Sequence, residues 1–379
     1  MTVPMDHPGR RARFSEALTA AGIDLAFCPP SGDLEYLTGF PRRMASFGNN
    51  EYANQWVAGA LFRPGAEPVY VIPQGYAAFN LPGGIDGEVV AVANTDDAAT
   101  VFAGLLRKHG PPRTVAVSAR TFGATAVRIL ETLPEVRLVD LDTVLNPLRR
   151  VKSAEELHAL ERASLICDTV MAEITPRVAV GVTELEIAAE IDYLMRKHGG
   201  RTSSFDTGVF AMGPGDGRDA STRVSANALV PGLGVSFDFG TVVDGYCSDF
   251  GRTVHLGEPG EEYRRVYDIV IAAQAAGMAA ALPGATAADV HRATRQVIVD
   301  AGYGDRFRHR TGHCIGLDTH ERPFISEEDH TVLEEGMTFT IEPSIFWPGH
   351  VGARVEDLFV CTPTGAHSLN RYHREMVVV

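Results

Sequence analysis

The chain has 379 residues, a length that suits two domains better than a single small core. Hydrophobic residues make up 45% of it and charged residues 22%, which is typical of a soluble globular protein. Its formal net charge of −14 argues against binding to nucleic acid or to an anionic membrane surface, because both require a basic face.

Apolar periodicity and turn residues predict that strands and helices alternate in the first part of the chain. We expect helices at 12–21, 96–109 and 124–133, and strands at 23–28, 56–62, 68–72, 89–92, 114–118 and 136–141. The strands 56–62 and 68–72 should form a hairpin around the glycine-containing loop 63–67. This alternation predicts an α/β domain that covers residues 1–150.

A second domain is predicted over residues 151–379, and it begins with two helix-start signals. Ser153 and Glu156 fit a capping box, in which a hydroxyl and a carboxylate satisfy free backbone N–H groups. A helix should follow to about residue 173. Thr183 and Glu186 form a second capping box, which opens a helix to about residue 198.

The second domain also contains an internal repeat. Two segments of the same length begin with glycine, carry threonine two residues later and an acid three residues after that, and end with glycine. At a nearly constant offset of 103 or 104 residues, the matching segments are 181–199 with 284–302, 207–210 with 311–314, and 232–238 with 336–342. Three matches in the same order indicate two similar halves that face one another.

The repeat places Asp238 in one half opposite Glu342 in the other. Each acid ends an apolar, β-branched run and should lie in a buried strand, where a lone carboxylate is costly. The next strand of each half supplies one more acid, Asp249 and Glu356. Four carboxylates could share one pocket only if cations neutralised them.

His313 lies among glycines in the segment 311–323. With the four carboxylates it forms a hard, oxygen-rich ligand set that suits Mn²⁺ or Co²⁺, with Zn²⁺ or Fe²⁺ as alternatives. Two such ions would hold a water and lower its pKa. Taken singly, the acids could be ordinary strand-end residues and His313 a core histidine, but their matching positions in two halves favour a metal site.

Residues 151–379 resemble the pita-bread metallopeptidase family, which includes methionine aminopeptidase, Xaa-Pro aminopeptidase, prolidase and creatinase. Four motifs carry the resemblance: Asp238-x10-Asp249-x2-Arg-Thr, Gly312-His-x-Ile-Gly-Leu-x2-His-Glu-x-Pro323, Glu335-Gly-Met-x-Phe-Thr-Ile-Glu-Pro343 and Arg354-x-Glu356-Asp. Residues 1–150 resemble the N-terminal domain of prolidase and creatinase, which methionine aminopeptidases lack. The resemblance implies a two-domain α+β fold, with a creatinase-like α/β domain and a pita-bread catalytic domain that has a pseudo-twofold repeat.

The resemblance also implies roles for individual residues. Glu342 is expected to take the proton of the attacking water, and His320 to donate to the substrate carbonyl or the oxyanion. On its own, His320 could equally be a structural residue that caps a helix or a turn. His313 and Arg354 are expected to contact the substrate. The implied ligands of two metal ions are Asp238, Asp249, His313, Glu342 and Glu356.

One position departs from this family. Its peptidases carry a histidine about 17 residues before the first metal aspartate, and Ser221 stands there in this chain. Because that histidine helps to hold a peptide, its absence argues for a small acidic or zwitterionic amide as substrate. Ser221 and Arg223, or alternatively Arg218, would then contact the substrate, since arginine pairs bidentately with a carboxylate. The arginines could equally be surface residues.

The leading hypothesis is a metal-dependent hydrolase of a C–N bond, in a peptide or a small amide, that uses a water activated by two metal ions. A non-peptide hydrolase or a lyase on the same scaffold is an alternative, although the lyase relatives place an acid where Gly240 stands. A catalytically inactive binding module is least favoured, because such modules lose ligands.

We further expect a cytoplasmic homodimer. The five cysteines are scattered, no apolar stretch reaches the roughly 18 residues that span a bilayer, and the N-terminus carries no secretory segment. In prolidase and creatinase, the N-terminal domain of the neighbouring subunit walls the active site. This chain has aromatic and basic residues for such a contact at Tyr36, Phe40, Arg42 and Arg43.

Overall fold

The computed structural model describes residues 4–42, 52–81, 84–215, 218 and 222–379. The described chain divides into two compact units, one that ends at Arg149 and one that begins at Arg150. No helix in these ranges is long and apolar enough to cross a membrane.

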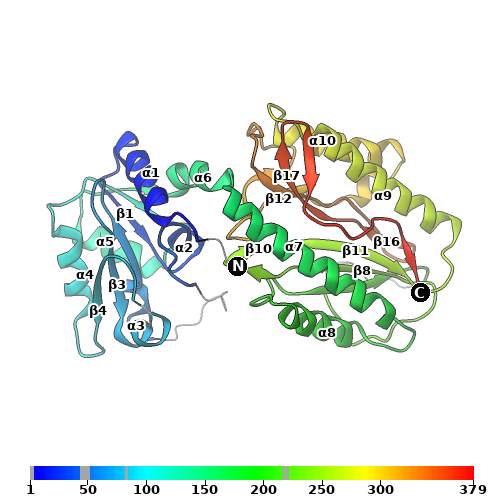
Figure 1. Cartoon of the computed structure of the whole chain (residues 1–379), viewed down its shortest axis with the longest axis horizontal. Coiled ribbons are helices and arrows are strands. Elements are labelled where there is room, and N and C mark those ends of the chain that lie inside the picture. The colour runs from blue at the N-terminus through cyan, green and yellow to red at the C-terminus, as the bar shows by residue number, and fades with distance from the viewer. Residues whose placement is uncertain (1–3, 43–51, 82–83, 216–217, 219–221) are drawn as a thin grey trace. The chain divides into compact units, whose positions relative to one another are not determined.

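The first unit is built on a six-stranded sheet with the order β4-β3-β2-β1-β5-β6 (Figure 1). Its strands are β1 (Leu25–Cys28), β2 (Gly59–Phe62), β3 (Val69–Pro73), β4 (Glu88–Val92), β5 (Thr114–Val117) and β6 (Arg137–Asp140). Its helices are α1 (His7–Ala20), α2 (Gly32–Thr38), α3 (Gln74–Asn80), α4 (Ala98–Arg107), α5 (Gly123–Thr132) and α6 (Asp142–Arg150). The hairpin of β2 and β3 is antiparallel, whereas β1 pairs in parallel with β5.

Within the described residues, this unit contains every strand and helix expected, and three α-helices that were not expected. The helices α2 and α3 have only seven residues each, so they are too short to give a helical hydrophobic period. The helix α6 contains Pro147, which reads as a helix breaker in the sequence.

The residues suggested for a contact with a neighbouring subunit lie inside this unit. Tyr36 and Phe40 are buried, and the hydroxyl of Tyr36 donates to the carbonyl of Leu148 at 2.8 Å. Arg42 is buried as well and lies 2.9 Å from Glu35. These three side chains therefore offer no exposed surface, and Arg43 lies outside the described residues.

In the described part of the second unit, two larger sheets are each covered by two helices. One sheet has the order β19-β11-β8-β7 and the other β13-β12-β14-β17-β18, and β9 with β10 and β15 with β16 form two small ribbons. The helices are α7 (Ala154–Ile174), α8 (Glu184–Lys197), α9 (Glu261–Ala280) and α10 (Ala287–Asp300). The strands are β7 (Gly208–Met212), β8 (Gly234–Phe239), β9 (Val242–Val243), β10 (Tyr246–Cys247), β11 (Phe250–His255), β12 (Gly312–Cys314), β13 (Glu321–Ile325), β14 (Thr338–Ile341), β15 (Ser344–Trp347), β16 (Val351–Arg354), β17 (Asp357–Thr362), β18 (Gly365–Ser368) and β19 (Val377–Val378).

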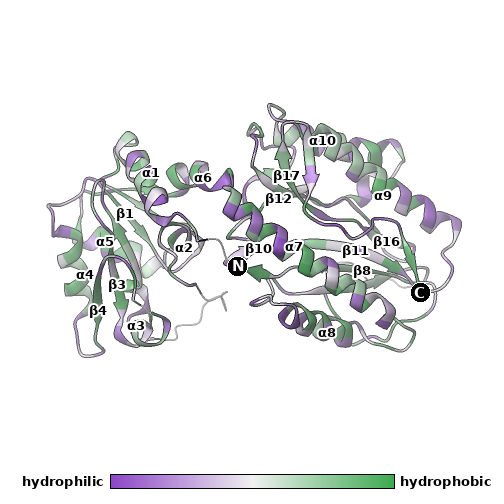
Figure 2. Cartoon of the chain, in the orientation of Figure 1, coloured by the Kyte–Doolittle hydropathy of each residue, from purple (hydrophilic) through white to green (hydrophobic). Residues whose placement is uncertain are grey.

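The two halves of this unit repeat the same elements in the same order, as the sequence predicts. The strands β7, β8 and β11 pair antiparallel in one half, as β12, β14 and β17 do in the other. Capping boxes open α7, α8 and α10 at Ser153, Thr183 and Thr286. Figure 2 shows hydrophobic residues concentrated in the strands, while the helices alternate hydrophobic and hydrophilic residues. Each pair of helices thus buries one face on its own sheet.

Candidate metal centre

The two sheets meet at Gly251 and Glu356, and this contact brings the acids of the two halves together. The backbone N–H of Glu356 donates to the carbonyl of Gly251 at 2.9 Å, and a weaker bond of 3.3 Å runs the other way. A Cβ on Gly251 would lie 2.9 Å from Oε2 of Glu356, so this close approach requires glycine. Asp249 and Glu356 stand directly before β11 and β17 rather than within these strands.

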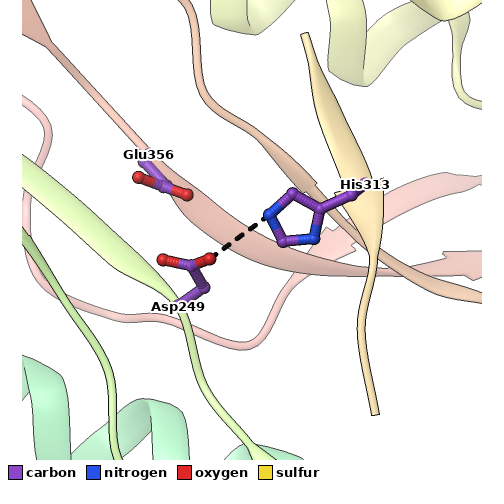
Figure 3. A group of neighbouring side chains, drawn as sticks. All are labelled: Asp249, His313 and Glu356. Atoms are coloured by element: carbon purple, nitrogen blue, oxygen red, sulfur yellow. Dashed lines mark ion pairs between the residues drawn. The ribbon is translucent and has the colours of Figure 1, made fainter. Parts of the chain in front are cut away.

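Asp249, His313 and Glu356 form a compact group of three potential ligands (Figure 3). One ligand atom from each residue lies within 4.8 Å of the others, and Nε2 of His313 is 3.3 Å from Oδ2 of Asp249. Nδ1 of His313 lies 3.1 Å from the carbonyl oxygen of Cys314, which can only accept a hydrogen bond. Nδ1 therefore carries a proton, and Nε2 is the ring nitrogen that faces the acids.

Glu342 joins this group from the end of β14. Its Oε1 lies 3.5 Å from Nε2 of His313 and accepts a hydrogen bond from the hydroxyl of Thr340 at 3.3 Å. Its backbone N–H donates to the carbonyl of Thr311 at 2.8 Å. These contacts fix Glu342 beside the three-residue group.

The donor set fits a divalent cation. Oδ1 of Asp249 and Oε2 of Glu356 are buried and accept no hydrogen bond within the described part of the chain. Burial raises the pKa of Glu342 to about 7, and burial followed by repulsion from Asp249 raises the pKa of Glu356 well above its usual range. A cation would remove this cost by neutralising the carboxylates, and hard oxygen ligands of this kind suit Mn²⁺.

Asp238 lies in β8 and makes a different set of contacts. Its Oδ2 is 2.5 Å from Nη1 of Arg354 and 3.1 Å from Nη1 of Arg223. Burial would raise the pKa of Asp238, but the two guanidinium groups hold it below its usual range. Among the four acids, Asp238 is therefore the one whose pKa the protein's own cations hold below its usual value.

Arg354 reaches three of the four acids from the end of β16. Besides Asp238, it lies 3.8 Å from Oε2 of Glu342 and 3.8 Å from Oε2 of Glu356. Burial would lower the pKa of Arg354, but these carboxylates outweigh burial and raise it. The guanidinium is thus a permanent positive charge at the centre of the acids.

Two further histidines face this site. The ring of His320 lies 4.2 Å from that of His313, centre to centre, and partial burial lowers the pKa of His320 to about 3, which favours its neutral form. His309 was missed in the sequence, although it stands four residues before His313. Its Nε2 lies 2.5 Å from the hydroxyl of Ser344, its Nδ1 lies 4.0 Å from Glu342, and burial lowers its pKa to about 3.

The two arginines considered for substrate contact have different surroundings. Arg223 lies against the ring of Phe205, donates to the carbonyl of Asp206 at 2.8 Å and remains 42% exposed. Arg218 pairs with the buried carboxylate of Glu184 at 2.8 Å. Arg223, unlike Arg218, therefore faces the site, and Ser221 lies outside the described residues.

These groups open into one cavity of about 940 Å³. The four acids and His313 line part of it, and aromatic and polar residues from other segments line the rest. The further lining residues are Phe205, Asp206, Arg223, His291, Arg295, Phe307, Arg308, His309, Arg310, Thr319, His320, Ser326, Glu327, Glu328 and Arg354. A cavity of this size suits a ligand as large as a small peptide.

Both domains of the chain match known protein families. Residues 158–363 match the family model of metallopeptidase family M24, and residues 10–151 match that of the creatinase/prolidase N-terminal domain. The Xaa-Pro dipeptidase of Pyrococcus furiosus is 38% identical over 241 residues, which cover 62% of this chain and 68% of that protein.

Solved structures extend this likeness over the whole chain. The prolidase from Thermococcus sibiricus matches with a TM-score of 0.90 at 28% identity and covers 100% of both chains. The dipeptidase PepE from Mycobacterium ulcerans matches with a TM-score of 0.86 at 33% identity and covers 98% of both. The two-domain α+β fold expected from the sequence is thereby confirmed.

Proposed function

Because the chain belongs to metallopeptidase family M24, we propose that it hydrolyses the C–N bond of a dipeptide or of an amide of similar size. The observation that carries this proposal is the buried group of Asp249, His313 and Glu356, with Glu342 beside it. Two of its buried carboxylate oxygens accept no hydrogen bond from the described residues, and a bound cation would satisfy them.

We propose two divalent ions as cofactors, Mn²⁺ first, with Co²⁺, Zn²⁺ or Fe²⁺ as alternatives. The ligands would be Asp249, His313, Glu342 and Glu356, with Asp238 completing the second site. When bound, such ions supply a water of lowered pKa and a Lewis acid for the substrate carbonyl. To bind an ion, Asp238 would either release Oδ2 from Arg354 and Arg223 or keep these ion pairs while the same carboxylate binds the metal.

The chain's own residues would move the protons of the reaction. Glu342, whose metal-free pKa is about 7, is suited to accept a proton near neutral pH. His320 lies beside His313, and the single ring N–H of its neutral form would donate to the carbonyl oxygen as negative charge develops there. Arg354 would hold the acids in place and contact the substrate.

We propose that the substrate carries a carboxylate. Arg223 is the first residue to orient it, because its guanidinium is part-exposed in the cavity and pairs well with a planar anion. The relatives make Xaa-Pro dipeptides the first substrates to test. Because Ser221 stands where the family's peptidases have a histidine, we expect the enzyme to prefer a small acidic or zwitterionic amide over these dipeptides.

The lyase alternative is disfavoured by the surroundings of Gly240. A Cβ at this position would lie 1.9 Å from the carbonyl oxygen of Ser248 and 2.3 Å from the hydroxyl of Ser204. The position therefore has no room for the additional acid that this alternative requires.

An activity screen tests the proposal. The purified enzyme, loaded with Mn²⁺, is assayed against Xaa-Pro dipeptides, other dipeptides and small acidic amides. Release of a free amine that requires both metal and an intact Glu342 would support hydrolysis, whereas elimination products without hydrolysis would refute it.

We also propose a cytoplasmic homodimer. The creatinase/prolidase N-terminal domain and the five buried free cysteines support it. Sedimentation of an active monomer near 40.8 kDa would rule out the dimer.

A further inference from the structure

Lys152 and Glu321 form an ion pair that is almost wholly buried. Nζ of Lys152 lies 2.8 Å from Oε2 of Glu321, and the side chains are 1% and 5% exposed. The pair joins residues 169 positions apart, and Glu321 directly follows His320. A buried pair contributes little net stability, because desolvation offsets the attraction, so its position is the more informative feature.

The carboxylate of Glu321 fills the inside of the loop 315–320. Its Oε1 accepts the backbone N–H of Asp318 at 3.2 Å. A Cβ on Gly316 would lie 2.7 Å from the same oxygen, so the loop closes directly on the carboxylate. Glu321 also pairs across the sheet with Cys314, which follows His313. The loop between the two histidines is thus wrapped around one charged group.

Hydrogen bonds to other segments fix both the loop 315–320 and the backbone of Lys152. The carbonyl of Gly316 accepts the N–H of Cys247 at 2.7 Å, and the hydroxyl of Thr319 donates to the carbonyl of Ser204 at 3.1 Å. The backbone N–H of Lys152 donates to the carbonyl of Gly336 at 3.0 Å, close to the start of β14. Lys152 therefore holds Glu321 from an anchored position.

We propose that Lys152 is a positioning residue for His320. By neutralising and orienting the carboxylate of Glu321, it fixes the loop that ends at His320 and so the place of the His320 ring beside His313. The inference rests on the proposed function, in which His320 donates to the developing oxyanion. Lys152 touches no substrate and acts only through Glu321 and the loop.

A double-mutant cycle on the metal-loaded full-length enzyme tests this role. The variants are Lys152→Met, His320→Ala and their combination, assayed with the most active substrate of the screen. The matched control is Arg150→Met, which removes a half-exposed pair with Glu334 two residues away. We expect Lys152→Met to lower kcat about 10²-fold with KM nearly unchanged, and Arg150→Met to change neither.

In the His320→Ala background, Lys152→Met should cause no further loss of kcat. With diamagnetic Zn²⁺ in place of Mn²⁺, the ring signals of ¹⁵N-histidine should show His320 displaced in Lys152→Met and unmoved in Arg150→Met. If Lys152→Met does not fold, Lys152→Gln takes its place, because its amide still donates to Glu321 without charge; the expected loss is then about tenfold.

The outcomes separate this inference from the proposed function. Additive losses in the double variant, or an unshifted His320 signal, would overturn the role of Lys152 and leave the hydrolase proposal intact. An unchanged kcat in His320→Ala would remove the oxyanion role of His320, and the inference about Lys152 with it.

Discussion

Nη1 of Arg354 lies 2.5 Å from Oδ2 of Asp238, and the same oxygen accepts a second hydrogen bond from Arg223 at 3.1 Å. Two guanidinium groups thus compensate one buried carboxylate. Asp238 stays ionised in the metal-free protein, while burial favours the neutral forms of Glu342 and Glu356. The contribution of the two arginines to the stability of the site can therefore be measured in the absence of metal.

Arg354→Met should destabilise the metal-free protein by about 3 kcal/mol or more, because it leaves a buried carboxylate with one partner fewer. The control is Arg223→Met, which removes the other, 42% exposed partner of the same oxygen and should cost about 1 kcal/mol or less. Urea unfolding in the presence of a chelator measures both. Equal losses would show that Arg354 has no special role among the acids.

Glu342→Gln should abolish turnover while the fold is retained. The amide can neither accept a proton nor match the charge of a ligand, so we expect a barrier higher by about 4 kcal/mol or more, close to a thousandfold in rate. The control is Glu328→Gln, an exposed residue of the same cavity. Retention of even a tenth of the wild-type activity at full metal loading would contradict the role of Glu342.

Substrate preference should follow Arg223 and Ser221. We expect the wild type to cleave common Xaa-Pro dipeptides with kcat/KM below about 10⁴ M⁻¹s⁻¹ and a small acidic amide more efficiently. Arg223→Ala should reduce kcat/KM for the acidic amide, whereas Ser221→His should raise it for Xaa-Pro dipeptides. A wild type that is already efficient on those dipeptides would show that the missing histidine is harmless.

Metal affinity should rise with pH between 6 and 8. The pKa of Glu342 in the folded, metal-free protein is about 7, above the value of about 4.3 expected in the unfolded chain. The contribution of Glu342 to stability is therefore fully present below the unfolded pKa and is lost as pH rises through about 7. A metal ion must displace this proton, so the titration of Glu342 alone should lower the affinity about tenfold for each pH unit below 7.

Calorimetric titration with Mn²⁺ at pH 6, 7 and 8 measures this dependence. The difference in Tm between metal-loaded and metal-free protein should widen over the same range. Glu342→Gln should bind more weakly and with a flatter dependence on pH. An affinity that does not change with pH in the wild type would show that Glu342 is already ionised without metal.

The sequence predicts most of the scaffold because its signals are local or repeated. The capping boxes at Ser153 and Thr183 form as expected, with their reciprocal hydrogen bonds. The acids at 238, 249, 342 and 356 converge because equivalent strands of two similar halves meet at Gly251. Repetition at a fixed offset therefore carries information about which distant residues come together.

Other features depend on contacts that leave no local signal. Packing, rather than any hydrophobic period, stabilises the short helices α2 and α3. The pair of Lys152 with Glu321 joins residues 169 positions apart, and His309 reaches the site only because β12 and β15 bring it to Ser344. The burial of Tyr36, Phe40 and Arg42 likewise depends on tertiary packing, which is why they could be mistaken for an exposed surface.

The metal content of the purified enzyme tests the central claim most directly. After reconstitution with Mn²⁺ and removal of free ion, elemental analysis should find about two equivalents per chain, and His313→Ala should lose most of them together with the activity. Less than about half an equivalent in an active wild type would contradict a metal-dependent hydrolase built on Asp249, His313 and Glu356.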